Sequence, residues 1–389
     1  MVSKNSINLL TPMKSRLHNS LAPACLLALT TLLLGGNETA LHAQIAIGSG
    51  TGNTVGGSYS FLGGGFENTN SGGVLSFLGG GANNTASGSN SVIVGGLLNV
   101  AIGNNSFIGG GHQNSASADS ATVAGGIVNH ALGQRATVSG GSYNAASGYA
   151  AAIGGGQNNN ATATDATVSG GSSNNAAGSY SAIPGGIGNT ATNYAFAAGY
   201  GAQATNQGAF VWSSQVVTVS TNAYSFTARS PGGVRFFTST NNVGAFLAPN
   251  ATAWSVLSDR NSKENFQPID ERGILHQLEQ MPVTAWSYKH DPTRRYIGPT
   301  AQDFKAAFGL GTDDRSINTL DEAGVTLAAI KGMSEELKQR DQQMAQRDQQ
   351  ISSLRSQMSL RDAKIESLEK KMNEFSERLN LLPPAPSQK

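Results

Sequence analysis

A fifteen-residue repeat occupies the first half of the chain and restricts its possible folds more than any other feature. Segments such as SFLGGG, SFIGGG and ATVSGG begin at Ser60 and, after one step of sixteen residues, recur at every fifteenth position. In successive copies up to Asn189, an aliphatic residue is followed by an asparagine six positions later. From the second copy onward an alanine lies two positions further on. Such a fixed period indicates that each copy is one coil, which buries its apolar side only by stacking on its neighbours.

Each coil is expected to contain two very short strands joined by tight turns. The paired glycines and the scarcity of good helix formers exclude a helical repeat. The asparagines are predicted to stack in a ladder, in which each side-chain amide bonds to the next coil. One aliphatic residue and one alanine per coil form only a small core. We therefore expect several chains to pack side by side, most simply three around an axis.

Coils of the pattern S-x-[VI]-x-G-G, over about residues 60–209, resemble the head of trimeric autotransporter adhesins. The resemblance implies a parallel β-roll, a homotrimer, and a surface glycan or protein as the ligand of the head. Two features depart from that family. Its repeat is more often shorter, and its members finish in a membrane β-barrel anchor, whereas this chain ends in LLPPAPSQK.

Residues 1–43 have the layout of a secretory signal peptide. Three basic residues precede an apolar run at residues 26–34, and cleavage is expected after Ala43. An N-terminal membrane anchor is the alternative, for which the apolar run is short. The only cysteine, Cys25, lies in this segment. A mature chain without thiols has no disulfides, thiolate metal sites or cysteine nucleophiles.

The charge distribution argues against several classes of function. The whole chain has 25 basic and 24 acidic residues, so net charge indicates neither nucleic acid nor an anionic membrane as a partner. Almost all of this charge follows Trp212. A glycan hydrolase needs two carboxylates at a controlled separation, and the repeats contain few acids. We expect no cofactor, no metal and no membrane-spanning segment after signal cleavage.

A short β segment is predicted to follow the repeats. In AYSFTARSPGGVRFF, apolar and polar residues alternate on both sides of Pro231. This alternation predicts two strands separated by a turn. We interpret residues 210–257 as a β neck.

From Ser258 the sequence becomes that of an ordinary globular domain. The motifs SDRNSK, YIGPTAQDF and INTLDEAGVTLAAIKGM follow one another, with a helical pattern at residues 270–281 and strands at 283–289 and 295–301 between the first and the last. A helix is predicted from Ala301. This run, about residues 258–339, resembles the self-cleaving intramolecular chaperone of phage endosialidases and tail fibres.

The resemblance implies a nucleophile at Ser258, a base at Lys263, and cleavage between Leu257 and Ser258. Three positions depart from the family's usual pattern and could slow cleavage: Ser262, Pro299 and Asp303. The implied enzyme is a single-turnover, self-cleaving serine endopeptidase.

The chemistry of the two side chains is consistent with this assignment. A serine hydroxyl is a weak nucleophile until a base removes its proton, and a lysine amine can serve as the base when burial lowers its pKa. Five positions separate Ser258 from Lys263, so the two must meet across a turn, for which Asp259, Arg260 and Asn261 are suitable residues. Without the resemblance, an exposed serine and lysine beside a polar loop would be the simpler interpretation.

A heptad pattern covers residues 330–382. Its first seam position is apolar throughout, at Ile330, Leu337, Met344, Ile351, Met358, Ile365, Met372 and Leu379. Its second is apolar at Met333, Leu354, Leu368, Phe375 and Leu382 but arginine at Arg340, Arg347 and Arg361. The pattern predicts a coiled coil, expected to be three-stranded, in which the charged positions specify the oligomer at some cost in stability.

The expected organisation is therefore mainly β at the start, then a small α+β domain, then a trimeric coiled coil. The segments are a signal peptide (1–43), a β-solenoid head (44–209), a β neck (210–257), a chaperone auto-peptidase (258–339), a coiled coil (330–382) and a disordered tail (383–389). This organisation predicts a secreted, surface-exposed, trimeric fibre or adhesin-like protein. The alternative is a structural stalk that never cleaves and keeps its coiled coil as a clamp.

Overall fold

The computed structural model describes residues 45–46, 50–241 and 243–381. The expected signal peptide, the last seam residue Leu382 and the expected tail lie outside the described residues. The chain divides into two compact units between Leu257 and Ser258. Each unit is described by itself.

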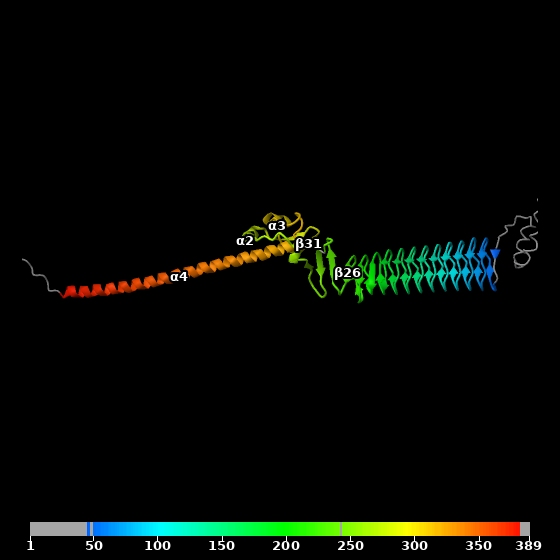
Figure 1. The fold of residues 1–389 in the computed structure, drawn as a ribbon, viewed down its shortest axis with the longest axis horizontal. Helices are drawn as coiled ribbons and strands as arrows, with labels where there is room; N and C mark the ends of the chain where they lie inside the picture. Colours follow the sequence, from blue (N-terminus) through cyan, green and yellow to red (C-terminus); the bar gives the residue numbers. More distant parts are fainter. Residues whose placement is uncertain (1–44, 47–49, 242, 382–389) are drawn as a thin grey trace, which may run out of the picture. The chain divides into compact units, whose positions relative to one another are not determined.

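The first unit is a parallel β-solenoid, whose stacked coils run from blue to green in Figure 1. Its paired residues are separated by sixteen positions between Phe61 and Phe77 and by fifteen between Phe77 and Val92. The predicted fold, period and single longer step are thereby confirmed.

Two parallel sheets run along the solenoid. The larger contains β1 (Ile45–Ala46), β3 (Phe61–Leu62), β5 (Phe77–Leu78), β7 (Val92–Ile93), β9 (Phe107–Ile108), β11 (Thr122–Val123), β13 (Thr137–Val138), β15 (Ala152–Ile153), β17 (Thr167–Val168), β19 (Ala182–Ile183), β22 (Phe196–Tyr200), β24 (Phe210–Ser213) and β26 (Phe226–Arg229), with β20 (Gly186–Ile187) paired to β22. The smaller contains β2 (Thr54–Val55), β4 (Thr69–Asn70), β6 (Thr85–Ala86), β8 (Val100–Ala101), β10 (Ser115–Ala116), β12 (His130–Ala131), β14 (Ala145–Ala146), β16 (Asn160–Ala161), β18 (Asn175–Ala176), β21 (Thr190–Ala191), β23 (Ala202–Ala204) and β25 (Thr218–Val219).

The chain turns sharply at left-handed residues in each coil. Several of these are not glycine, such as Leu75 (φ 57°), Val128 (φ 54°) and Tyr180 (φ 58°). The left-handed conformation costs such residues about 1–2 kcal/mol. Glycine is required at a further turn, because a Cβ on Gly81 (φ 97°) would lie 2.1 Å from the carbonyl oxygen of Gly96. Stacking of neighbouring coils must therefore hold the strained corners in place.

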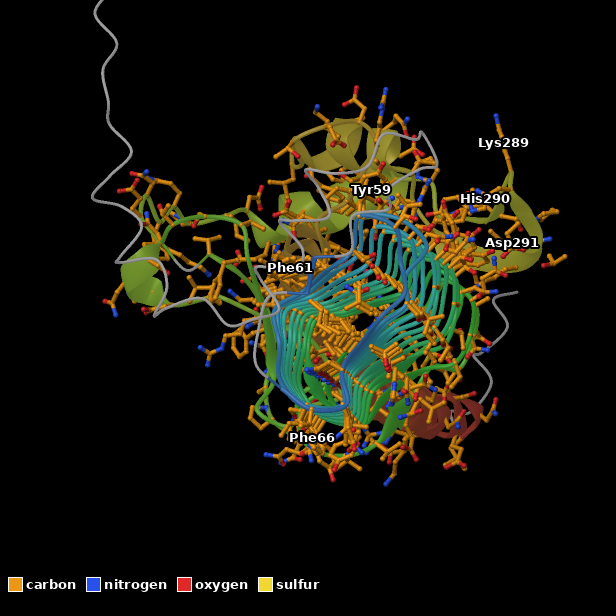
Figure 2. All side chains as sticks on the ribbon, turned by 90° about the vertical axis from the view of Figure 1, so that its right-hand side faces the viewer. Tyr59, Phe61, Phe66, Lys289, His290 and Asp291 are labelled. Atoms are coloured by element: carbon orange, nitrogen blue, oxygen red, sulfur yellow. The ribbon has the colours of Figure 1, made fainter. Side chains whose placement is uncertain are left out.

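The interior of the solenoid consists of columns of equivalent residues. The two predicted columns, aliphatic from Leu62 to Ile183 and alanine from Ala86 to Ala191, are buried. A third buried column, of serine and alanine, begins at Ser60 and was not predicted as core. Figure 2 views the coils end-on and shows Tyr59, Phe61 and Phe66 around their outer edge.

The predicted asparagine ladder is also present. The side-chain oxygen of Asn84 accepts from the backbone N–H of Asn99 at 2.9 Å. The side-chain amide of Asn99 donates to the carbonyl oxygens of Gly95 at 3.1 Å and Gly111 at 2.9 Å. Because these asparagines are fully buried, the ladder satisfies the buried backbone N–H of Asn99 and ties the side-chain amide to carbonyls nearer the surface.

Parallel pairing continues beyond residue 209, where the β neck was expected to begin. Strands β24 and β26 stack on β22, and the rings of Phe196, Phe210 and Phe226 lie 4.6 and 4.8 Å apart in succession. The two strands expected around Pro231 are β26 and β27 (Val234–Phe237), and they belong to different sheets. β27 pairs antiparallel with β28 (Gly244–Leu247), which pairs with β29 (Ser255–Val256).

The second unit contains a small α+β region. A 3₁₀ turn, η1 (Arg260–Ser262), precedes α2 (Glu271–Gln280), the hairpin of β30 (Thr284–Tyr288) and β31 (Asp291–Gly298), and α3 (Ala301–Phe308). Met281, Phe304 and Val325 form its buried core. The predicted helices and strands are present, although β31 begins earlier than expected because the hairpin continues to Asp291.

The long helix α4 (Thr319–Asn380) has two different apolar surfaces. Its first turns bury a group of mostly small residues, Val325, Ala328, Ala329 and Gly332. A Cβ on Gly332 would lie 2.4 Å from the carbonyl oxygen of Glu271 in α2, so glycine permits this close approach. The heptad seam is exposed in the single chain, as at Ile351, where 47% of the residue's surface is accessible. The helix that the heptads predict is confirmed.

Ion pairs hold α2 against the start of α4. Lys331 Nζ lies 2.6 Å from Glu271 Oε1, and Arg272 Nε lies 3.5 Å from Glu335 Oε2. The hydrogen bond from Lys331 lowers the pKa of Glu271, and the same bond raises the pKa of Lys331.

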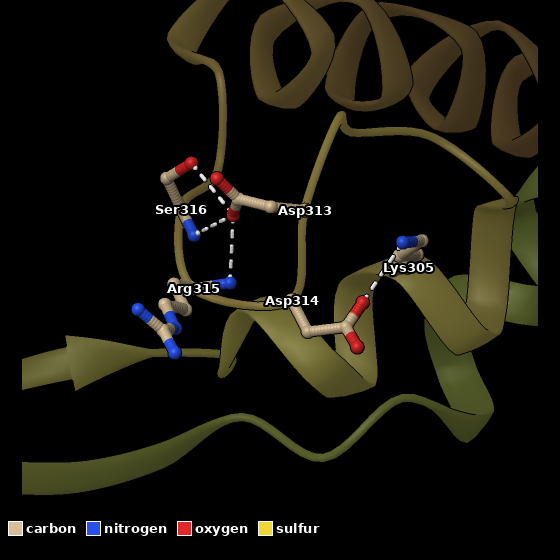
Figure 3. A network of polar contacts seen from close by, with 5 residues as sticks. All are labelled: Lys305, Asp313, Asp314, Arg315 and Ser316. Atoms are coloured by element: carbon tan, nitrogen blue, oxygen red, sulfur yellow. Dashed lines mark hydrogen bonds and ion pairs between the residues drawn. The ribbon is translucent and has the colours of Figure 1, made fainter.

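The loop between α3 and α4 is organised by Asp313 (Figure 3). Its carboxylate accepts from the backbone N–H of Arg315 at 2.8 Å, and from the backbone N–H and the hydroxyl of Ser316 at 2.9 and 3.0 Å. These bonds, first among them that from Arg315, lower the pKa of Asp313. Lys305 and Asp314 form an ion pair at 2.8 Å, which attaches the loop to α3.

Candidate functional site

Ser258 is the first residue of the second unit and directly follows Leu257, the last residue of the first. The boundary between the two compact units therefore coincides with the peptide bond at which cleavage was predicted. Leu257 is 40% exposed.

A short capped turn reverses the chain after Ser258. The carboxylate of Asp259 accepts from the backbone N–H of Asn261 at 3.0 Å, which caps η1. The backbone N–H of Lys263 donates to the carbonyl of Arg260 at 3.2 Å and closes the turn. Aspartate and asparagine favour such turns because their side chains bond to nearby backbone groups. The turn expected at these residues is thus present.

This turn brings together the two predicted site residues. Lys263 Nζ lies 2.7 Å from Ser258 Oγ, within hydrogen-bonding distance. In this geometry a protonated amine donates to the hydroxyl, whereas a neutral amine can accept the hydroxyl proton. Proton transfer from Ser258 to Lys263 is therefore geometrically possible without rearrangement.

A single chain does not bury the amine of Lys263, the condition under which a lysine can serve as the base. Both Ser258 and Lys263 are exposed. Within the turn, the guanidinium of Arg260 lies 5.0 Å from the ring centre of Phe266. In the single chain the capped turn therefore leaves both side chains accessible to solvent.

Two of the three departures from the family pattern have clear structural roles. Ser262 Oγ donates to the carbonyl of Asp259 at 2.9 Å and so belongs to the turn itself. Asp303 belongs to the cap of α3: the hydroxyl of Thr300 donates to its carboxylate at 2.7 Å and accepts from its backbone N–H at 3.2 Å. Pro299 joins β31 to this cap. Neither Ser262 nor Asp303 obstructs the contact between Ser258 and Lys263.

The contact of α2 with α4 was not identified from the sequence. Its signal is the close spacing of Ala328, Ala329 and Gly332 within LAAIKGM, since small residues on one helix face allow another backbone to approach. In the described part of the chain, no group of three or more histidine, cysteine, aspartate or glutamate residues could hold a metal ion. Within the same residues, no helix is long and apolar enough to cross a bilayer.

Comparison with known protein families supports the resemblance noted in the sequence. Residues 258–309 match a family model described as the chaperone of endosialidase. The match begins at Ser258 and ends at Gly309, the residue that caps α3. Together with the parallel solenoid of the first unit, it confirms the resemblance to an endosialidase-type chaperone that follows β repeats. No curated protein matches the chain.

Proposed function

We propose that the chain is a trimeric surface fibre whose chaperone drives assembly and then separates by cleavage between Leu257 and Ser258. The observation that carries this proposal is the 2.7 Å distance between Lys263 Nζ and Ser258 Oγ. It is supported by the position of the pair, which stands at the start of the matched segment and at the boundary of the two units.

The proposed reaction starts at the residue that follows the scissile bond. Neutral Lys263 accepts the hydroxyl proton of Ser258, and Oγ attacks the carbonyl carbon of Leu257 through a five-membered ring. The bond from that carbon to the nitrogen of Ser258 then breaks, and the nitrogen takes up the proton. Water hydrolyses the resulting ester, which leaves a carboxylate on Leu257 and a free amine on Ser258.

Exposure of the pair in the single chain provides a reason for coupling cleavage to assembly. Water stabilises the protonated, inactive form of an exposed lysine, and desolvation by a neighbouring chain would favour the neutral form. The exposed seam of α4 offers the surface through which further copies would be recruited. Cleavage would thereby follow correct assembly.

Release of the chaperone would make the fibre kinetically stable. Parallel coils form slowly, because each one gains its core only when its neighbours stack on it. A coiled coil that gathers three chains raises their local concentration before the coils form. Its removal afterwards leaves a rod that cannot readily unfold and refold.

Replacement of Lys263 tests the proposed base. We expect Lys263→Ala to abolish cleavage while the trimer still forms, with intact mass as the measurement. Lys263→Arg should be equally inactive, because arginine keeps the positive charge but cannot lose its proton at working pH. Lys289→Arg, at the tip of the β30–β31 hairpin, is the matched control and should cleave normally.

The pH dependence gives a second measurement on the unmodified chain. Only the neutral amine accepts a proton, so the cleavage rate should rise with pH. Substantial cleavage by both Lys263 variants, together with a flat pH profile, would remove Lys263 from the mechanism. It would favour instead a strained peptide bond that breaks without a base.

The coupling to assembly is tested at the seam of α4. Ile351→Asp puts a charge into the apolar seam and should prevent both trimer formation and cleavage. Gln349→Asp places the same charge on the outer face of the helix and should have little effect. Normal cleavage by a monomeric Ile351→Asp protein would show that cleavage does not require assembly.

A non-cleaving stalk is the second candidate, and the exposure of both Ser258 and Lys263 favours it. In that case the trimer would contain only full-length chains, which a denaturing gel would reveal. The family resemblance supports an extracellular or surface location. Secretion through residues 1–43 and a glycan or protein ligand for the solenoid belong to the proposal.

A further inference from the structure

Three arginines interrupt the second seam position of α4, and an aspartate immediately follows each of them. In heptad notation the arginines occupy position d and the aspartates position e. The three pairs are Arg340–Asp341, Arg347–Asp348 and Arg361–Asp362.

Among the described residues, none of these six side chains has a charged partner within the single chain. All six are exposed, and the four ion pairs among the described residues include none of them. Opposite charges are nevertheless available one helical turn away, such as Glu336 for Arg340 and Lys338 for Asp341. The arrangement therefore does not serve to stabilise the isolated helix.

The geometry of a parallel coiled coil supplies the missing partners. Each seam side chain inserts into a hole formed by four residues of the facing helix. For a residue at position d, one of these four is the e residue of the same heptad. With parallel helices in register, each seam arginine therefore meets the aspartate that follows its own counterpart on the neighbouring chain.

We propose that α4 binds two further copies of itself in parallel, and that these interchain arginine–aspartate contacts fix the register. The inference rests on the trimer of the proposed function and adds the residues that align it. Its partner is a second and third copy of this chain, selected by charge complementarity along the seam.

Arg355 makes the register unique. It occupies position e, and in register it faces Leu354 of the neighbouring helix. A slip of one heptad in one direction places it opposite Arg347, and a slip in the other direction places it opposite Arg361. Like charges at such positions destabilise the assembly.

A closed trimer cannot avoid this repulsion when one chain slips. The slipped chain forms an interface with each of its two neighbours. The register is shifted by one heptad in one direction at the first interface and in the opposite direction at the second. At both of these interfaces, Arg355 of one chain then lies opposite a seam arginine of the other chain. Only the aligned trimer combines every arginine–aspartate contact with no contact between Arg355 and a seam arginine.

Cysteine cross-linking of the full chain tests this register. The background carries Ser258→Ala, so that α4 stays attached, and Cys25→Ala. Two versions with Met344→Cys or Ile351→Cys are co-expressed and oxidised. An aligned trimer cross-links like with like, whereas a slip of one heptad joins position 344 to position 351. We expect the mixed product to be a trace.

Arg355→Asp should remove the discrimination. The mixed product is expected to rise at least about tenfold. At a slipped interface the variant replaces the repulsion between two arginines by an attraction between aspartate and arginine. Lys338→Asp makes the same change of charge at position b, outside the seam, and should leave the mixed product at a trace.

The outcomes separate this inference from the proposed function. A trimer by mass whose Arg355→Asp variant stays aligned would overturn the inference and leave the trimer standing. A trimer with neither cross-link would also overturn it, because the helices would not be parallel and in register. A monomer by mass in the unmodified chain would overturn both.

Discussion

Asn114 is the residue at which the energetic value of the asparagine ladder can be measured most directly. Its side chain is buried in the middle of the solenoid. The side-chain oxygen accepts from the backbone N–H of Asn129 at 3.0 Å. The side-chain amide donates to the carbonyl oxygens of Gly110 and Gly126, both at 2.9 Å. Asn114→Ala therefore removes three hydrogen bonds from the interior at once.

The cost follows from the groups left behind. Gly126 keeps a partner, because its carbonyl also accepts from the backbone N–H of His112 at 2.9 Å. The N–H of Asn129 loses the bond described above in the buried interior, and the partly buried carbonyl of Gly110 loses its bond as well. A buried group without a partner costs about 1–3 kcal/mol and a partly exposed one costs less, so Asn114→Ala should destabilise the local coils by about 2–4 kcal/mol.

Native-state hydrogen exchange of the full chain measures this cost. Peptides that cover residues 110–129 should exchange about 30 to 1,000 times faster in Asn114→Ala than in the unmodified protein. Asn160→Thr is the matched control, because Asn160 is exposed and threonine occupies the equivalent position in β4 and β6. Exchange in the control should change by less than about threefold.

A second substitution separates hydrogen bonding from volume. Asn114→Asp keeps the shape and the accepting oxygen, but turns an oxygen toward the carbonyls of Gly110 and Gly126. It should be at least as destabilising as alanine. If Asn114→Asp exchanged as slowly as the unmodified protein, or if Asn114→Ala matched Asn160→Thr, the ladder would not be a principal source of stability.

Two further predictions concern the second unit. Gly332→Ala should weaken the α2–α4 contact by about 2 kcal/mol, because its Cβ would clash with the α2 backbone. Gly324→Ala should stabilise α4 by up to about 1 kcal/mol, because its Cβ would meet nothing within 4 Å. Hydrogen exchange in α2 and α4 measures both effects, and equal effects of the two variants would contradict the packing argument. The ion pair of Glu271 and Lys331 should protect α2 over a defined pH window. Because the pKa of Glu271 is lowered, its contribution is present above the ordinary value of 4.5 and is lost as pH falls through the lowered pKa. Because the pKa of Lys331 is raised, its contribution is present below 10.5 and is lost as pH rises through the raised pKa. The protection of α2 amides against exchange should therefore fall at both pH limits. Glu271→Gln should remove the ion pair's contribution to both changes.

The solenoid could be predicted because the period of a repeat can be read directly from the sequence. Equivalent residues such as the aliphatic column from Leu62 to Ile183 recur at a fixed spacing, which indicates that the coils stack. The third column was missed because serine and alanine at Ser60 and its equivalents resemble surface residues when each is considered alone. Their burial becomes evident only when the inner face of each coil is known.

The end of the solenoid and the exposure of the candidate site depend on contacts that local patterns do not contain. Phe210 and Phe226 extend the stacked rings, although the repeat motif has already faded there. The separation of Ser258 from Lys263 predicted that they meet across a turn. It could not predict that the turn would face solvent, since burial depends on which neighbouring surfaces cover the pair.

The strained corners of the coils have a consequence for how such a protein can change over evolutionary time. Residues as different as Leu75, Arg135 and Tyr180 adopt the same left-handed geometry at equivalent corners. The conformation is imposed by the hydrogen bonds of adjacent coils, so the identity of the side chain is largely free. Substitutions can therefore accumulate along this edge while the asparagine and aliphatic columns stay constant. Such a rod could alter what it presents to its surroundings, one corner at a time, without having to refold differently.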